Sequence, residues 1–173
     1  MTQKGKHILF IGFMGSGKTT VSRTLAREMQ LPLVDVDTRI EQLQAKSISE
    51  IFAQVGEEGF RAIETETLKG LFSIDRAIIS CGGGIVCNPA NRPILKELGH
   101  VVYLRISCEG AIERISDPST RPLLSGARPV QEIYAERLPW YEQCADITVD
   151  VEGGTKIENA AAVRAALRER GLL

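Results

Sequence analysis

Two patterns of hydrophobic and polar positions alternate along the chain, and together they predict an α/β protein. Residues 7–12 form a continuous apolar run that ends in glycine, which is typical of a parallel strand buried on both faces. The predicted strands cover residues 7–12, 33–37, 76–80, 101–106 and 146–151. The predicted helices cover residues 18–29, 38–69 with breaks near Lys46 and Gly56, 92–98, 107–115 and 132–141, and a last helix opened by a capping box at 155–158. Because strands and helices alternate throughout, we expect a parallel sheet with helices on both faces, a three-layer α/β/α sandwich.

Length and charge narrow the class of protein. The 173 residues contain no repeat, low-complexity segment or linker, so we expect one domain over residues 1–173. A formal net charge of −1 argues against the broad basic face of a nucleic-acid-binding or membrane-surface protein. The four cysteines form no C-x-x-C pair, which argues against a zinc site. The first apolar run is too short for a signal peptide or a membrane span, and free thiols fit a reducing compartment, so we expect a cytoplasmic protein.

A phosphate-binding motif follows the first predicted strand. Residues 12–19 (GFMGSGKT) fit G-x-x-x-x-G-K-[ST], and they open the first predicted helix, which is the context that a P-loop requires. Backbone N–H groups in such a loop converge on a polyphosphate, Lys18 reaches the β- and γ-phosphates, and the Thr19 hydroxyl ligates Mg²⁺. We therefore expect ATP or GTP binding. The expected nucleotide-binding residues of the loop are Gly15, Ser16, Gly17, Lys18, Thr19 and Thr20.

Carboxylates at the end of the second predicted strand narrow the type of nucleotide chemistry. The third predicted strand, 76–80, lacks the aspartate of a Walker-B strand, which disfavours motor-type ATPases, and no Asn-Lys-x-Asp segment indicates a GTPase. Asp35 and Asp37 instead end the second predicted strand, where a doubly wound sheet would place them beside the phosphate loop. One carboxylate could serve the metal and the other the acceptor. For Asp37, capping the N-terminus of the next helix is as good an explanation as a functional role. Asp35, in contrast, is expected to be buried within the strand.

Three consecutive glycines follow the third predicted strand, at positions 82–84. Without side chains they would let the backbone approach a ligand closely. A flexible turn is the alternative interpretation of the same residues.

Three arginines are candidates for binding anions. Arg61 and Arg137 lie in helical patterns, where an arginine is usually solvated, and Arg61 could pair with Glu64 three residues later. Arg121 lies in the proline-rich segment 116–129, which resembles a surface loop. A lid that closes over the nucleotide would have reason to carry such a cation to the transferring phosphate.

In order and spacing, the motifs together resemble the shikimate kinase family. The resemblance spans residues 8 to about 151 and rests on the segments GFMGSGKTT, VDVDTRIE, SISEIF, GEEGFRAIE, ISCGGGIV, VVYLRIS, RPLL and ERLPWYEQCAD. It implies a P-loop kinase fold like that of nucleoside monophosphate kinases, with a five-stranded parallel sheet in the order 2-3-1-4-5. It also implies transfer of the ATP γ-phosphate to the 3-hydroxyl of shikimate, a step of chorismate and aromatic amino acid biosynthesis.

The resemblance also implies a role for each candidate residue. Shikimate would be bound between acceptor-binding helices at about 38–70 and the glycine loop, and the lid would cover about 116–129. The implied shikimate-binding residues are Asp37, Arg61, Gly82, Gly83, Gly84 and Arg137. The implied catalytic residues are Lys18, Asp37 and Arg121, with Thr19 and Asp35 at Mg²⁺ and Arg114 and Arg121 at the nucleotide. The partners would be the small molecules shikimate and ATP, and we expect a monomer.

Two positions depart from the family pattern, namely Ala45, where glycine is common, and Trp140, where a smaller apolar residue is frequent. The main rival is another kinase of the same fold, for a gluconate or nucleoside monophosphate acceptor. Arg61, Arg137 and the glycines at 82–84 argue against it. The rival from another class is a non-catalytic nucleotide-binding module, which would need no acceptor pocket.

Overall fold

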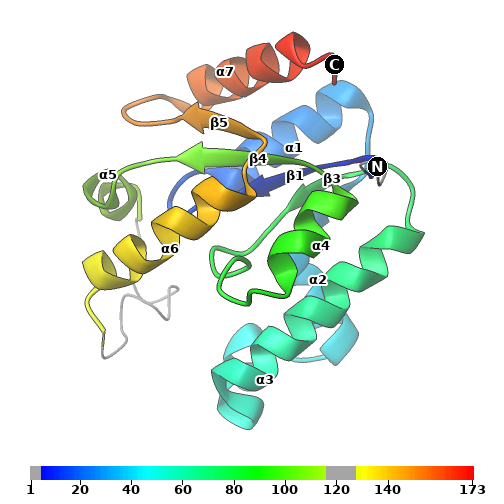
Figure 1. Cartoon of the computed structure of the whole chain (residues 1–173), viewed down its shortest axis with the longest axis vertical. Helices are drawn as coiled ribbons and strands as arrows, with labels where there is room; N and C mark the ends of the chain where they lie inside the picture. Colours follow the sequence, from blue (N-terminus) through cyan, green and yellow to red (C-terminus); the bar gives the residue numbers. More distant parts are fainter. Residues whose placement is uncertain (1–4, 116–127) are drawn as a thin grey trace.

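β1 lies at the centre of a five-stranded parallel sheet in a computed structural model that describes residues 5–115 and 128–173 (Figure 1). The strand order is β2-β3-β1-β4-β5, as the resemblance implies. The strands are β1 His7–Ile11, β2 Leu33–Asp35, β3 Ile78–Ser80, β4 Gly99–Arg105 and β5 Ile147–Asp150. The helices are α1 Lys18–Met29, α2 Val36–Gln44, α3 Ile48–Gly70, α4 Asn91–Leu98, α5 Cys108–Glu113, α6 Val130–Cys144 and α7 Lys156–Glu169, with a 3-10 helix at Leu71–Ser73.

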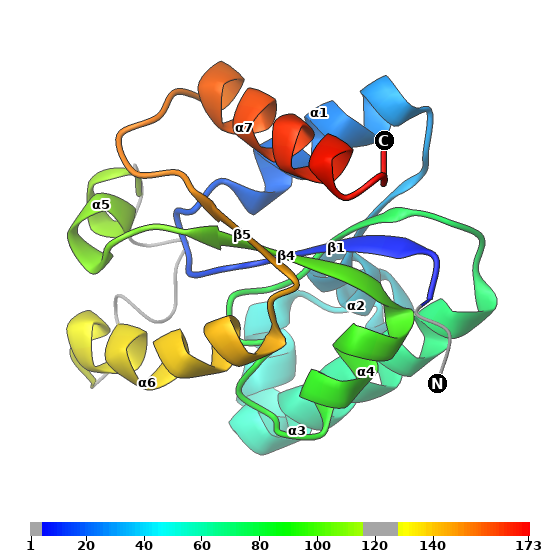
Figure 2. The same ribbon diagram turned by 45° about the horizontal axis from the view of Figure 1, so that its top comes forward.

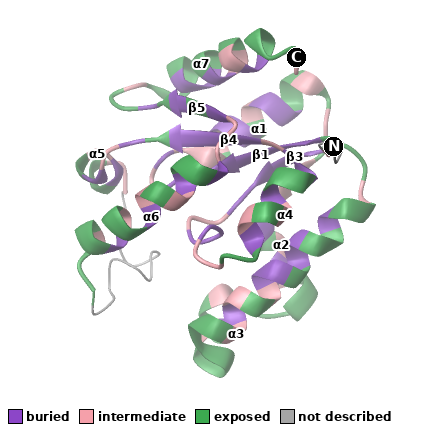
Figure 3. Ribbon diagram, in the orientation of Figure 1, coloured by how far each residue is buried: buried purple, intermediate pink, exposed green. Residues whose placement is uncertain are grey.

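Helices cover both faces of this sheet, so the predicted three-layer sandwich is confirmed. α1 and α7 lie side by side over one face, while α3, α4 and α6 lie on the other (Figures 1 and 2). Every residue of β1 is buried, as its unbroken apolar run predicts (Figure 3). In the register of the sheet, Phe10 lies opposite Ser80 of β3 and Val102 of β4. The carboxyl ends of β1 and β3 therefore meet, and the loops that follow them become neighbours.

The second strand is shorter than predicted, and this corrects the placement of both carboxylates. β2 ends at Asp35, and α2 begins at Val36, so Asp37 lies in the first turn of a helix and not at the end of a strand. Asp35, and not Asp37, is the N-cap, because its Oδ1 accepts a hydrogen bond of 2.9 Å from the Thr38 N–H. Asp35 is half-buried rather than buried within the strand.

The predicted helical stretch from 38 to 69 is interrupted at both expected places. α2 and α3 are separate helices on either side of Lys46. Within α3, Gly56 has φ 69° and ψ −174°, a conformation that residues with side chains rarely adopt, so the helix axis is kinked there. Ser47 and Glu50 form a capping box at the start of α3.

Smaller differences concern the third strand and the segment after α5. β3 begins at Ile78 rather than at residue 76, because the Ala77 N–H donates to the His7 side chain at Nδ1 and not to the backbone of a neighbouring strand. The predicted lid, 116–129, lies outside the described residues except for its last two positions. Within the described ranges, no helix is long and apolar enough to cross a membrane.

Candidate active site

The loop between β1 and α1 has the backbone of a phosphate-binding loop. Gly15 and Gly17 have φ values of 77° and 88°, so both positions favour glycine. α1 begins at Lys18, and its first N–H groups are therefore available to an anion. The Lys18 ammonium donates hydrogen bonds to the carbonyls of Gly12 and Phe13, at 2.7 and 3.0 Å. The loop thus combines helix N–H donors with a cation held close to its own backbone.

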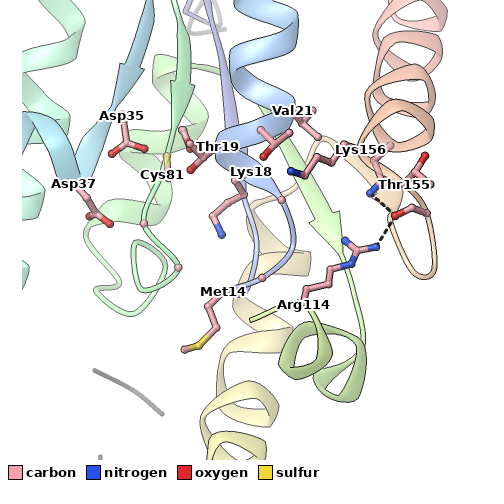
Figure 4. Close-up of a pocket in the computed structure, with 18 residues that line it drawn as sticks. Met14, Lys18, Thr19, Val21, Asp35, Asp37, Cys81, Arg114, Thr155 and Lys156 are labelled. Atoms are coloured by element: carbon pink, nitrogen blue, oxygen red, sulfur yellow. Dashed lines mark hydrogen bonds between the residues drawn. The ribbon is translucent and has the colours of Figure 1, made fainter. Parts of the chain in front are cut away.

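A cavity of about 490 Å³ opens beside this loop, at the carboxyl end of the sheet (Figure 4). It brings together residues that the sequence predicts from four separate segments: Gly15, Gly17, Lys18, Thr19, Thr20, Asp35, Asp37, Gly82, Gly83 and Arg114. Ser16 is buried, and its hydroxyl lies 3.4 Å from the Lys18 ammonium. Arg61, Gly84 and Arg137 do not line this cavity, and Arg121 lies outside the residues that the structure describes.

Asp35 and Asp37 lie on the opposite side of the cavity from the start of α7 (Figure 4). Burial raises the pKa of Asp37 above its ordinary value, and the neighbouring charge of Asp35 raises it further, while Lys18 lowers it. Asp37 is therefore a stronger proton acceptor than an exposed aspartate. Because Thr38 occupies one oxygen of Asp35, the second oxygen is available for another partner.

Each of the three consecutive glycines lies against a different residue of the predicted acceptor site. A Cβ atom on Gly82 would lie 2.8 Å from Oδ1 of Asp37. One on Gly84 would lie 2.3 Å from Nη2 of Arg61, and one on Gly83 would lie 3.8 Å from Nη1 of Arg137. The loop is therefore not merely a flexible turn. The absence of side chains at 82 and 84 lets the Asp37 carboxylate and the Arg61 guanidinium approach the loop closely, whereas Arg137 lies at ordinary contact distance from Gly83.

Arg61 is held by an acidic side chain that is almost completely buried. Its Nη1 donates to Glu64 Oε1 at 3.0 Å, and a looser ion pair joins Nη2 to Glu57 at 3.5 Å. Pairing with Glu64 was one of the two sequence interpretations. The other, a solvated surface arginine, is wrong, because only 14% of the Arg61 side chain is exposed. Burial raises the pKa of Glu64 to about 7, although the Arg61 charge opposes the shift.

Arg137 lies on α6 and is 4% exposed, so it too is not a solvated helix residue. On the next turn of the helix, the Tyr141 hydroxyl donates to the Gly83 carbonyl and thereby holds α6 against the glycine loop. Nη1 of Arg137 and Nε of Arg61 are both buried, and neither has a hydrogen-bond partner among the residues that the structure describes. A buried N–H group without a partner is costly, so both groups are suited to accept an anionic ligand.

The opposite end of the cavity is built by α5 and the loop before α7. The Arg114 guanidinium donates to the carbonyls of Val151 and Gly154, the latter at 3.1 Å. From the loop side, the Glu152 carboxylate accepts hydrogen bonds from the N–H and the hydroxyl of Ser107, at 2.7 and 3.0 Å. Two oppositely charged side chains therefore tie the loop to both ends of α5.

Several lining residues were not predicted. They are Val21, Ser80, Cys81, Gly154, Thr155, Lys156 and Asn159, whereas Met14 belongs to the predicted P-loop motif. The capping box at Thr155 was the available signal for the last four, because it marks the start of α7 beside the cavity. Ser80 and Cys81 could have been inferred from strand order, since β3 lies next to β1.

A sequence model of the shikimate kinase family matches residues 14–168. The chain belongs to the shikimate kinase family. A shikimate kinase of Dictyoglomus turgidum is 42% identical over 148 residues, which cover 83% of this chain and 86% of the relative. One of Moorella thermoacetica is 39% identical over 165 residues, covering 94% and 92% of the two chains.

Solved structures agree with this family membership. The shikimate kinase of Acinetobacter baumannii in complex with shikimate superposes with a TM-score of 0.89 at 33% identity, covering 98% of this chain and 96% of that one. A gluconokinase of Sinorhizobium meliloti and a thymidylate kinase of Candida albicans match with TM-scores of 0.60 and 0.65 at 16% and 15% identity. At this level of identity, the gluconokinase and the thymidylate kinase show only that they have the same P-loop kinase fold as this chain.

Proposed function

We propose that this protein transfers the γ-phosphoryl group of ATP to the 3-hydroxyl of shikimate, giving shikimate 3-phosphate and ADP for chorismate and aromatic amino acid biosynthesis. One observation carries the proposal: the glycines at 82–84 lie against Asp37, Arg61 and Arg137, next to the P-loop cavity. An acceptor with one carboxylate and adjacent hydroxyls needs a cationic clamp and a hydroxyl acceptor. These three side chains supply both groups.

The acceptor carboxylate would pair with Arg61 and Arg137, because each has a buried nitrogen to which no described residue is hydrogen-bonded. Asp37 would accept a hydrogen bond from the reacting hydroxyl and take its proton. The raised pKa of Asp37 makes its carboxylate a better proton acceptor than an exposed one. The glycine loop at 82–84 would contact the ring of the acceptor through its backbone.

Phosphoryl transfer proceeds through a loose transition state, which needs alignment and charge compensation more than a strong base. Lys18, at the start of α1, would bind the β- and γ-phosphate oxygens. Arg121 would add a second cation from a lid formed by residues 116–129. We therefore assign more of the rate enhancement to Lys18 and Arg121 than to Asp37.

The residues of the cavity fit a bound Mg²⁺–ATP. The Thr19 hydroxyl and the Asp35 carboxylate both line the cavity and are oxygen ligands of the kind that Mg²⁺ prefers. When bound, Mg²⁺ would neutralise charge on the phosphates. Backbone N–H groups of the P-loop would hold the phosphates, and Arg114, with the loop before α7, would lie against adenine. We further propose that residues 1–173 form one monomeric, cytoplasmic kinase domain whose acceptor-binding helices span about 38–70.

ADP release, coupled to a spectroscopic assay, tests the proposal with shikimate, quinate, gluconate and nucleoside monophosphates as separate acceptors. We expect shikimate to give the highest kcat/KM. Quinate also combines a carboxylate with ring hydroxyls, so it is the most demanding comparison. No shikimate-dependent ADP release would overturn the proposal. ATP binding without transfer to any acceptor would favour a non-catalytic nucleotide-binding module.

A further inference from the structure

The first two residues of α4 hold the part of the loop that follows the three glycines. The Asn91 side-chain amide donates to the Ile85 carbonyl at 2.9 Å. The Arg92 Nε donates to the next carbonyl, that of Val86, at 3.0 Å. Asn91 is completely buried. Two consecutive backbone carbonyls directly after Gly84 are therefore fixed by two consecutive side chains.

Asn91 also connects this loop to α3, the helix that carries Arg61. The Thr65 hydroxyl lies 2.7 Å from Asn91 Oδ1 and 3.0 Å from the Arg61 carbonyl, one helical turn earlier. The Asn88 side chain donates to the same hydroxyl at 3.0 Å. Because Thr65 and Asn91 are both buried, water competes little for these hydrogen bonds. The position of Arg61 is thus coupled to the loop through Thr65.

Arg92 makes the corresponding connection to α6, the helix that carries Arg137. Its guanidinium lies over the ring of Trp140, 4.6 Å from the ring centroid. Trp140 is the only tryptophan of the chain, and it follows Arg137 by three residues, about one helical turn. Trp140 is also one of the two departures from the family pattern. Arg137 is thus coupled to the same loop through Trp140.

We propose that Asn91 and Arg92 are positioning residues that set the separation of Arg61 and Arg137 across the glycine loop. α4 packs against both α3 and α6, so it is the element between the two arginine-bearing helices. A clamp of two guanidinium groups on one carboxylate tolerates little displacement. The pair therefore tunes the affinity for the anionic acceptor without touching it. This inference rests on the proposed function of the same site.

Steady-state kinetics on variants of Arg92 and Trp140 test this positioning role. Arg92→Ala should raise the KM for shikimate about fivefold to twentyfold, whereas kcat and the KM for ATP stay within twofold of the wild type. Trp140→Leu should reproduce this effect because it removes the aromatic face, and Trp140→Phe should restore most of the affinity. If the two side chains act as one unit, the double variant Arg92→Ala/Trp140→Leu should resemble either single variant.

Arg164→Ala is the matched control, because Arg164 makes a comparable side-chain pair with Glu28 on the far side of the sheet from α4 and α6. It should leave both KM values unchanged. Equal rises in the KM for ATP and for shikimate, or a Trp140→Phe variant as impaired as Trp140→Leu, would overturn the positioning role. If Arg92→Ala does not fold, as judged by thermal unfolding, the two Trp140 variants decide the question.

Wild-type turnover with shikimate separates this inference from the proposed function. Absence of that turnover overturns the proposed function and the positioning role together. Normal wild-type turnover with an unchanged shikimate KM in Arg92→Ala and Trp140→Leu overturns the positioning role alone.

Discussion

Gly84→Ala tests whether the close approach of the glycine loop to Arg61 matters for binding the acceptor. The new Cβ atom would lie 2.3 Å from Nη2 and 2.5 Å from Nη1 of Arg61. Ordinary contact begins near 3.4 Å, so the guanidinium must retreat by about 1 Å. The buried Glu64 side chain resists that movement, because its Oε1 accepts a hydrogen bond of 3.0 Å from Arg61 Nη1.

The expected cost is one charge-assisted hydrogen bond to the acceptor carboxylate, about 1.5–3 kcal/mol, which corresponds to a roughly 10- to 150-fold rise in the KM for shikimate. The KM for ATP should stay within about twofold, because Gly84 does not line the nucleotide cavity. Initial rates with each substrate varied in turn give both constants. The direction and the selectivity of the effect are the essential part of the prediction.

Gly70→Ala is the control for this substitution. Gly70 ends α3 with φ −61°, and nothing lies within 4 Å of its ideal Cβ position, so alanine fits there without strain. It should leave both KM values unchanged and stabilise the protein by up to about 1 kcal/mol. A Gly84→Ala enzyme with a wild-type shikimate KM would refute the reasoning that connects this glycine to Arg61.

Three further predictions concern charge. Lys18→Ala should lower kcat at least about 100-fold, whereas Arg137→Ala should chiefly raise the KM for shikimate; the reverse pattern would contradict these roles. The pKa of Glu64 is raised to about 7 in the folded protein, so its contribution to stability is full below pH 4.5 and is lost as the pH rises through about 7. Thermal unfolding between pH 5 and 8 should therefore show that the wild type loses stability relative to Glu64→Gln as the pH rises, and parallel curves would argue against a buried titrating carboxyl. Burial lowers the pKa of His7, so its contribution has the opposite sign and is lost as the pH falls below 6.5. His7→Gln should lose less stability than the wild type between pH 7 and 5, and an identical loss in both proteins would exclude His7 as the cause.

Local signals in the sequence were sufficient for the framework of the fold. The apolar run at β1 and the G-x-x-x-x-G-K-[ST] spacing describe neighbouring residues, so they predict a buried strand, a tight loop and a helix without knowledge of the rest of the chain. The same holds for the capping box at the start of α7. The strand order came from the family resemblance, because strand spacing alone does not determine which strands pair.

Features that depend on tertiary packing were harder to predict from the sequence. From local sequence, an arginine in a helix is predicted to lie on the surface. Arg61 and Arg137 are buried because α3 and α6 pack around the glycine loop, and local sequence does not reveal that packing. The end of β2 was misplaced by two residues because Leu33–Asp35 and the following Val-Asp continue the same alternation of apolar and acidic residues. The N-cap hydrogen bond of Asp35 ends the strand earlier, and periodicity does not detect such a bond.

The tie between α5 and the loop before α7 has a consequence for biosynthesis of the protein. Glu152 and Ser107 are separated by 45 residues, and Arg114 reaches carbonyls 37 and 40 residues further along the chain. During translation the P-loop and the helices α1, α2 and α3 are synthesised long before these residues leave the ribosome. A nascent chain that stops before Glu152 would hold phosphate donors without the part of the cavity wall that we propose lies against adenine. High affinity for the whole nucleotide, as distinct from its phosphates, would therefore report that the loop after β5 has closed against α5.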